Sequence, residues 1–280
     1  MKRLLDIELQ KLWKNRASKI LIIAYFVLLT FIAFLASVNF KIVGFDFRLA
    51  DQGIFNFPYI WHFNTWIAAV LKFFLALVIV SMMGNEYTYG TLKQNLIDGL
   101  SKEEFIKSKV ITVFLFAVIS TFFIFVLSLI LGYNFSSYTE LSIVFSDMQY
   151  LGGYFLKLLA FFSFCLFAGI LVKRSAFSIG FIFVWFIIES IIRGFLHVKF
   201  LKDDQVLAGK IAGFLPLESM SNLIKEPFTR FEAYRAIESQ VSGTREIKFY
   251  GIHWYEIIIV LCWTAIFIYL SYRILKKRDL

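Results

Sequence analysis

The sequence has few of the residues that build disulfides and metal sites. Of its 280 residues, only two are cysteine and three are histidine. Cys165 and Cys262 both lie inside apolar runs, which is typical of small buried hydrophobic side chains rather than of a disulfide or a metal pair. None of His62, His197 and His253 has another ligand residue at metal-binding spacing. We therefore expect no metal ion and no other cofactor.

Two catalytic signatures are also missing. The chain has no G-x-x-x-x-G-K-S/T loop to bind nucleotide phosphates, and no soluble domain to hold one. The G-x-S-x-G pattern of serine hydrolases is absent as well. The only adjacent acidic pair, Asp203-Asp204, is interpreted as a solvated turn. The sequence thus predicts a protein that is not itself an enzyme.

Charge is scarce: 18% of the residues are charged, whereas 59% are hydrophobic and the mean hydropathy is +0.73. A soluble domain could not cover that much apolar surface with its polar residues. The net charge of +9 comes from basic residues at the ends of apolar runs, where they orient helices and contact anionic headgroups. The composition therefore indicates an integral membrane protein in contact with the lipid bilayer, with no nucleic-acid partner.

Six apolar segments approach the roughly 20 residues that a helix needs to cross a bilayer. They are residues 19–38, 66–83, 110–131, 154–172, 176–194 and 255–274. The first is not a cleavable signal peptide, because its apolar stretch is too long and no small-residue cleavage pattern follows it. The sequence predicts one all-α integral membrane domain over residues 1–280, with six transmembrane helices.

Lysine and arginine are unevenly distributed among the connections. The segment before the first span holds six and the 84–109 loop holds four, whereas the 39–65 loop holds two and the 132–153 loop none. Since these residues mark the cytosolic side, both termini are expected to be cytoplasmic in a multi-pass protein of the plasma (inner) membrane. The basic residues of the 195–254 loop do not oppose an extracytoplasmic position, because loops of about 60 residues translocate largely regardless of charge.

Two amphipathic elements accompany the spans. Leu5, Leu9 and Leu12 recur at helical spacing, so residues 1–18 are predicted to form a helix in the cytosolic interface. In the outer loop, Pro216 separates two apolar stripes. These stripes comprise Val206, Leu207, Ile211, Phe214 and Leu215, and then Leu217, Met220, Leu223 and Ile224. They predict an outer helical hairpin before the sixth span, which membrane depth tolerates only when it packs against protein.

The polar stretch at 84–109 separates two long apolar segments and predicts a short cytosolic helix-turn-helix. Together with the six spans, the interfacial helix and the outer hairpin, it resembles the ABC-2 type permeases, the transmembrane subunits of ATP-binding-cassette exporters. The motif that carries the resemblance is Glu86 followed by Gly90-Thr91-Leu92-Lys93, Ser101-Lys102 and Lys107-Ser108-Lys109. The family often has Pro and Ser-Arg in mid-loop, where this chain has Gly99-Leu100-Ser101-Lys102.

The resemblance implies a permease that pairs with a second copy or a related chain and is driven by a separate ABC ATPase. Its substrate would be hydrophobic or amphiphilic, such as a peptide, drug or lipid. The 84–109 loop would be a cytosolic coupling helix that fits a groove on the ATPase. The implied coupling residues are the charged rim of Glu86, Lys93, Lys102 and Lys107, the anchors Tyr87, Tyr89 and Leu92, and the turn at Gly90 and Thr91. The alternative is a solvated turn that carries membrane-edge charges.

Ionisable residues inside spans are costly and often functional. Lys72 could extend outward to the interface or line a substrate path. Glu189 and Arg193 lie one helical turn apart, so they could form a structural i,i+4 ion pair or line the translocation path. Two other functions stay open on the sequence alone. One is a lipid-modifying membrane enzyme that uses Glu189 or an outer histidine, and the other is a non-transporting scaffold or sensor.

Overall fold

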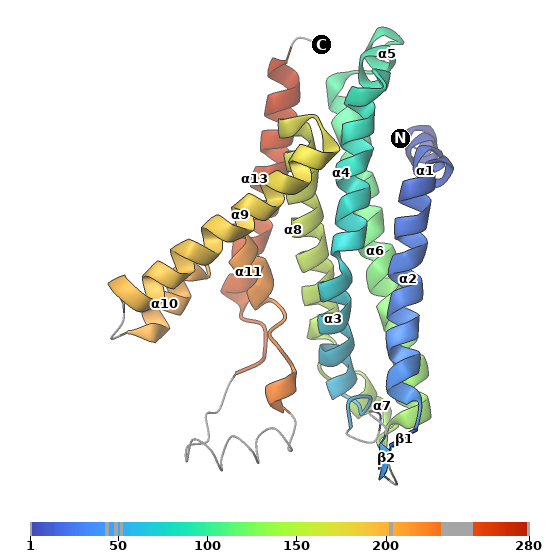
Figure 1. Ribbon diagram of the computed structural model, residues 1–280, viewed down its shortest axis with the longest axis vertical. Helices are drawn as coiled ribbons and strands as arrows, with labels where there is room; N and C mark the ends of the chain where they lie inside the picture. The colour runs from blue at the N-terminus through green and yellow to red at the C-terminus, as the bar shows by residue number, and fades with distance from the viewer. Residues whose placement is uncertain are drawn as a thin grey trace.

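The computed structural model describes residues 2–42, 45–47, 50, 53–201, 204–230 and 249–278, and long helices standing side by side dominate it (Figure 1). The long helices are α2 (Arg16–Ser37), α6 (Lys102–Phe135), α8 (Gln149–Val172), α9 (Ser175–Phe195) and α13 (Trp254–Lys277), with the consecutive pair α3 (Tyr59–Leu71) and α4 (Phe73–Thr88). The shorter elements are α1 (Lys2–Lys14), α5 (Thr91–Ile97), α7 (Leu141–Val144), the π-helix η2 (Leu196–Phe200), α10 (Gln205–Ala212), α11 (Pro216–Asn222), the 3₁₀ turn η3 (Phe228–Arg230) and an antiparallel pair of three-residue strands, β1 (Phe40–Ile42) and β2 (Phe45–Phe47).

The predicted all-helical membrane fold is confirmed. Among the described residues, five helices are long and apolar enough to cross a membrane, and there are six if α3 and α4, which meet at a bend of 40°, count as one span. Five of the predicted segments fall within one of these helices or the bent pair, and the first, 19–38, extends one residue beyond the end of α2. The hairpin of β1 and β2 was not predicted, and neither was the break at Lys72 in the second span.

Helix α8 forms the centre of the bundle, and 72% of the residues in its apolar 18-residue stretch are buried. It contacts α13, α4, α6, α9 and α3. Close packing against α4 depends on Gly169, where an added Cβ would lie 2.9 Å from the Cβ of Met83. Small residues at such crossings let helix backbones approach in a membrane, where burial from water does not drive association.

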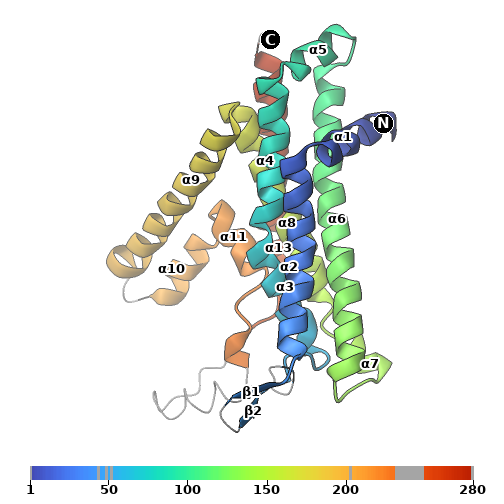
Figure 2. The same cartoon turned by 45° about the vertical axis from the view of Figure 1, so that its right-hand side comes forward.

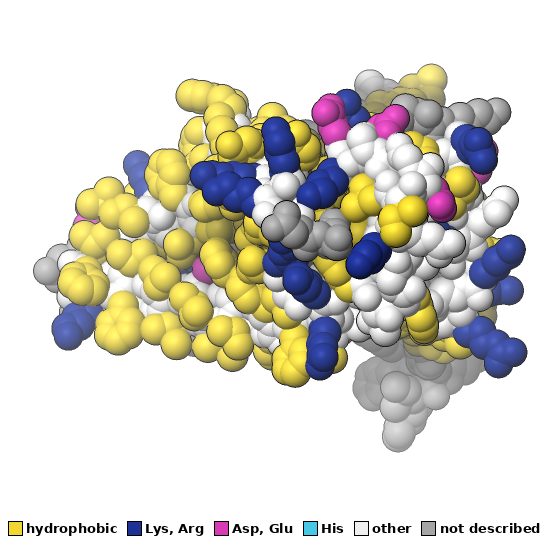
Figure 3. Space-filling model, turned by 90° about the horizontal axis from the view of Figure 1, so that it is seen from above, with side chains coloured by type: hydrophobic (Ala, Val, Ile, Leu, Met, Phe, Trp, Pro, Cys, Tyr) yellow, Lys and Arg dark blue, Asp and Glu magenta, His cyan; other side chains and the backbone are white. Residues whose placement is uncertain are grey.

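Helix α9 leans away from the bundle (Figures 1 and 2), and only 17% of the residues in its apolar 18-residue stretch are buried. Phe183, Val184 and Phe186 are among its exposed side chains. The view in Figure 3 shows hydrophobic side chains covering this arm of the molecule. A helix that is apolar on most sides is suited to lipid or to another membrane-embedded chain.

Both termini and α5 lie at one end of the bundle, and α7, β1 and β2 lie at the other (Figure 1). Lysine and arginine side chains gather around the first end when it is viewed from above (Figure 3). This arrangement agrees with the alternation predicted from basic residues. The predicted N-terminal helix is α1, and Asn15 starts a second helix by accepting a hydrogen bond from the Ser18 amide at 3.1 Å.

The outer hairpin is present as α10 and α11, and Pro216 occupies the first turn of α11. Helix α11 contacts α8, α9 and α13, as a hairpin at membrane depth requires. The rest of the predicted 195–254 loop includes residues 231–248, which lie outside the described residues.

Candidate functional site

Much of the polar 84–109 segment belongs to the two long helices on either side of it. Helix α4 extends to Thr88 and α6 begins at Lys102, so the separate loop is shorter than predicted. Between them, α5 is a helix of seven residues. Gly90 precedes α5 with a φ of +66°, in the left-handed region that favours glycine. An added Cβ at Gly90 would meet nothing within 4 Å, so the requirement for glycine is conformational rather than steric.

A capping box starts α6 after the turn. The Ser101 hydroxyl accepts from the Glu104 amide at 3.1 Å, and the Glu104 carboxylate accepts from the Ser101 amide at 3.0 Å. The exposed Lys107 pairs with Glu103 at 2.6 Å along the same helix. Lys102 instead donates to the carbonyl of Arg278 at 2.7 Å, which ties the start of α6 to the end of α13.

Four charged side chains form a cluster beneath α5, which we call the buried ion network: Glu8, Lys11, Glu86 and Lys109. Lys109 lies 2.7 Å from Glu86 and 2.6 Å from Glu8, and all three residues are at least 95% buried. The more exposed Lys11 reaches Glu86 at 2.9 Å. The network carries two positive and two negative charges, so its burial is compensated by pairing.

The buried ion network also holds the beginning of α5. The Thr91 hydroxyl donates to the second carboxylate oxygen of Glu86 at 2.5 Å. Glu86 therefore joins α5 to α1 and α6 through its two oxygens. Charge-assisted hydrogen bonds of this kind are about twice as strong as neutral ones.

The structure separates the predicted coupling residues into an inward and an outward set. Glu86 is 3% exposed and Leu92 is 2% exposed, so the predicted rim role of Glu86 and anchor role of Leu92 do not fit their positions. Both hold α5 against the bundle instead. Tyr87 is also partly buried, and its hydroxyl accepts from Arg278 at 3.3 Å.

The outward set is Tyr89, Gly90, Lys93 and Lys107, which are all exposed. Tyr89 is 73% exposed at the end of α4. Ile97, at the end of α5, is 75% exposed and was not predicted. Ile97 follows Leu96 in a short apolar stretch of the loop, and this stretch was the available signal.

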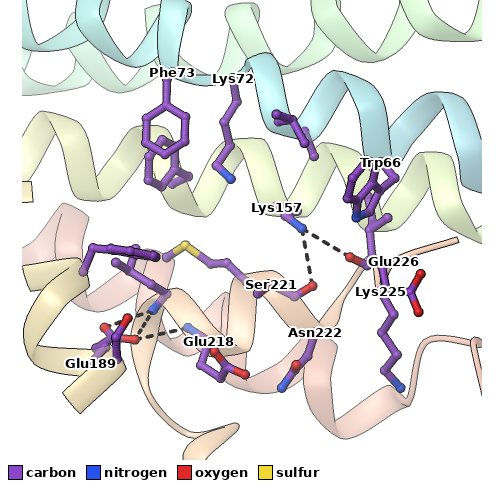
Figure 4. A pocket seen from close by; sticks show the side chains of 18 of the residues that line it. Trp66, Lys72, Phe73, Lys157, Glu189, Glu218, Ser221, Asn222, Lys225 and Glu226 are labelled. Atoms are coloured by element: carbon purple, nitrogen blue, oxygen red, sulfur yellow. Dashed lines mark hydrogen bonds between the residues drawn. The ribbon is translucent and has the colours of Figure 1, made fainter. Parts of the chain in front are cut away.

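A cavity of about 800 Å³ lies between the α3–α4 break, α8, α9 and α11 (Figure 4). It brings together Lys72, Glu189 and Arg193, which were predicted as candidate path or ion-pair residues. Lys157, at the start of the predicted fourth span, reaches the same cavity from α8. We call this space the lateral cavity.

Glu189 and Arg193 do not form the predicted ion pair with each other. Glu189 accepts hydrogen bonds from the Leu217 amide at 3.0 Å, the Glu218 amide at 3.2 Å and the Trp185 indole at 2.6 Å. The first amides of a helix have no intrahelical acceptor and favour a nearby carboxylate, which explains why Glu189 turns to the start of α11. Arg193 pairs with Glu218 at 3.0 Å.

Of the three lysines that line the lateral cavity, Lys225 pairs with Glu256 at 3.9 Å, whereas Lys157 and Lys72 have weaker partners. The Lys157 ammonium, on a residue that is 5% exposed, donates to the carbonyls of Ser221 at 3.4 Å and Ile224 at 3.5 Å. Lys72 lies over the rings of Phe161 at 4.8 Å and Phe73 at 5.3 Å. Within the described parts of the chain, neither lysine forms an ion pair with a carboxylate.

The three histidines have different surroundings. His62 is fully buried, stacks on Tyr150 at 4.1 Å and contacts the Lys225 carbonyl at 2.9 Å. His197 contacts the side chain of Gln205 at 2.7 Å, and His253 precedes α13. In the residues that the structure describes, no group of three metal-ligating side chains comes together. The contacts of His62 and His197 stabilise the outer part of the fold.

A family model described as ABC-2 family transporter protein matches residues 4–189, which is more than half of the chain. The matched region runs from α1 into α9 and contains α5 and the whole buried ion network. No curated protein gives a significant match to the chain.

Proposed function

The chain belongs to the ABC-2 family of transporter proteins and is a membrane permease of that class, and we propose that it exports a hydrophobic or amphiphilic substrate with energy from a separate ABC ATPase. The observation that carries this proposal is α5, a short helix held at the end of the bundle where both chain termini lie (Figure 1). The basic residues gathered at that end support a cytoplasmic position for α5 and the termini in the plasma (inner) membrane.

Helix α5 and its flanks are the proposed docking surface for the ATPase. Tyr89 and Ile97 are about three-quarters exposed at its two ends, and Lys93 is exposed between them. Exposed aromatic and aliphatic residues that project from a charged surface are typical anchors of a protein interface. Lys93 and Lys107 would contribute to the charged rim around these anchors.

The buried ion network is the proposed route by which motion of α5 reaches the membrane. Thr91 and Leu92 connect α5 to the bundle, through the Glu86 carboxylate and through apolar packing. Separating buried charges that lie less than 3 Å apart would cost several kcal/mol. Nucleotide-driven displacement of α5 would therefore carry the ends of α4, α6 and α1 with it.

A second permease copy, or a related chain, is the proposed partner within the membrane. Helix α9 is largely uncovered and the lateral cavity lies beside it. A neighbouring subunit packed along α9 would enclose a path between its own lateral cavity and that of this chain. The dimer and the direction of transport both rest on the family assignment.

The enzyme and scaffold alternatives have less support. Glu189 is occupied by three donors, and the buried His62 contacts a backbone carbonyl and packs on Tyr150. A scaffold would not require α5 to be tethered through buried charges.

The test is mild-detergent purification of the tagged chain from its native membrane, with identification of co-purifying proteins and assay of ATP hydrolysis. We expect a stoichiometric ABC ATPase that is lost in the double variant Tyr89→Ala/Ile97→Ala. Tyr138→Ala changes a 52% exposed tyrosine far from α5 and is the matched control. A chain that purifies alone, without nucleotide dependence, would favour a scaffold, and histidine-dependent lipid turnover would favour an enzyme.

A further inference from the structure

Two lysines of the lateral cavity, Lys72 and Lys157, form no ion pair with any carboxylate that the structure describes. The ammonium groups of Lys72 and Lys157 both extend into the cavity (Figure 4). Lys157 is 95% buried, and the carbonyls it reaches, at 3.4 and 3.5 Å, lie at the long limit of hydrogen bonding. A buried ammonium group in these surroundings is stabilised by an anion.

The carboxylates that line the same cavity are already engaged. Glu189 accepts from the first amides of α11, and Glu218 pairs with Arg193. Glu226 accepts from the Thr229 hydroxyl at 2.5 Å. The described carboxylates of the lining are therefore committed to internal contacts, whereas the amines of Lys72 and Lys157 pair with none of them.

The opening of the lateral cavity is apolar and faces sideways. Val70 and Phe73 lie at the break in the second span, and Phe183 and Phe186 lie on α9; each of these four side chains is more than half exposed. Because both elements belong to membrane spans, these side chains face the hydrocarbon region or a neighbouring subunit. The volume of about 800 Å³ lies within the range of roughly 300–1,000 Å³ that is common for small-molecule sites.

We propose that the lateral cavity binds a membrane amphiphile that carries a phosphate or carboxylate headgroup. The anionic group would lie between the ammonium groups of Lys72 and Lys157, and the hydrocarbon chain would leave past Phe183 and Phe186 along α9. A neutral or cationic headgroup would leave both lysines unpaired. That this amphiphile is also the exported substrate rests on the function proposed above, whereas its binding does not.

The test is a binding measurement on the purified full-length chain in a neutral detergent, without ATPase or nucleotide. The probes are radiolabelled phosphatidic acid and phosphatidylcholine with the same acyl chains, and bound lipid is counted by scintillation proximity. We expect phosphatidic acid to bind at least about tenfold more tightly, since one additional charge-assisted contact is sufficient for that ratio. Equal binding of the two lipids would overturn the proposal.

Variants locate the site. Lys72→Met and Lys157→Met should each remove most of the preference for phosphatidic acid, and Lys72→Arg should retain it. Lys199→Met removes an exposed lysine beyond the end of α9 and should leave the preference unchanged. Because Lys157→Met could disturb folding through its contacts with α11, Lys72→Met provides the independent test. A preference that survives in both methionine variants would overturn the assignment.

Three further outcomes separate this inference from other possibilities. If inorganic phosphate displaced phosphatidic acid at equal concentration, the cavity would be a site for free anions, and the amphiphile proposal would be wrong. If lipid binding were as expected but no ATPase associated with the chain, only the proposed function would fail. If the ATPase associated but the preference for phosphatidic acid were absent, only this inference would fail.

Discussion

The ammonium nitrogen of Lys109 lies 2.7 Å from a carboxylate oxygen of Glu86 and 2.6 Å from one of Glu8. A single fully buried lysine on α6 therefore joins the N-terminal helix to the end of the second span. The same Glu86 carboxylate accepts from Thr91 at the start of α5. The surface that we propose for ATPase docking is thus connected directly to three elements of the membrane domain.

Removal of the lysine should be strongly destabilising. Lys109→Met leaves two buried carboxylates with Lys11 alone, and we expect a loss of roughly 3–5 kcal/mol in the free energy of unfolding. Thermal unfolding of the purified chain in detergent measures the change. Lys107→Met removes a lysine whose side chain is 58% exposed and should leave the free energy of unfolding almost unchanged. Similar small losses in both variants would show that the network does not hold the helices together.

The turn before α5 should tolerate only residues that accept a positive φ. Gly90→Val should cost roughly 1–2 kcal/mol locally and displace α5, whereas Gly90→Asn should retain coupling because asparagine accepts the left-handed region. ATP hydrolysis coupled to transport in reconstituted vesicles is the measurement. Gly180→Ala, within α9 and without neighbours within 4 Å of the added Cβ, is the control and should behave as wild type. Normal coupling in Gly90→Val would show that the turn before α5 does not require a residue that accepts a positive φ.

At the outer hairpin, Glu189→Ala should destabilise more than Arg193→Leu. The first removes the carboxylate that caps α11, at a cost of about 0.5–2 kcal/mol. The second breaks an ion pair in which the Arg193 side chain is 48% exposed, at a cost of at most about 1 kcal/mol. Limited proteolysis and thermal unfolding would report both changes. A larger effect of Arg193→Leu would indicate that Arg193 neutralises a buried charge.

The spans could be predicted from sequence because each is a long apolar run with few charges. The buried ion network could be predicted only in part. Glu8 lies between Leu5 and Leu12 at helical spacing, so an acidic residue on the apolar face of α1 was a visible signal. Its partner Lys109 is 101 residues away, and their meeting depends on how α1 and α6 pack.

The Glu189 interpretation shows the opposite case, in which a local pattern was misleading. The spacing to Arg193 indicated an ion pair within one helix, but the free amides of α11 competed successfully for the carboxylate. Those amides meet Glu189 only because the hairpin packs on α9, and this packing cannot be read from the local sequence. In the same way, the lateral cavity combines residues from five helices, and no short sequence pattern marks it.

The most direct test of the account is site-specific photocrosslinking at Ile97 in native membranes. A photoreactive phenylalanine analogue at this 75% exposed position should yield a crosslinked product that contains an ABC ATPase, and the same analogue at Tyr138 should not. Absence of a protein adduct at Ile97, or the same adduct from both positions, would contradict ATPase docking at α5.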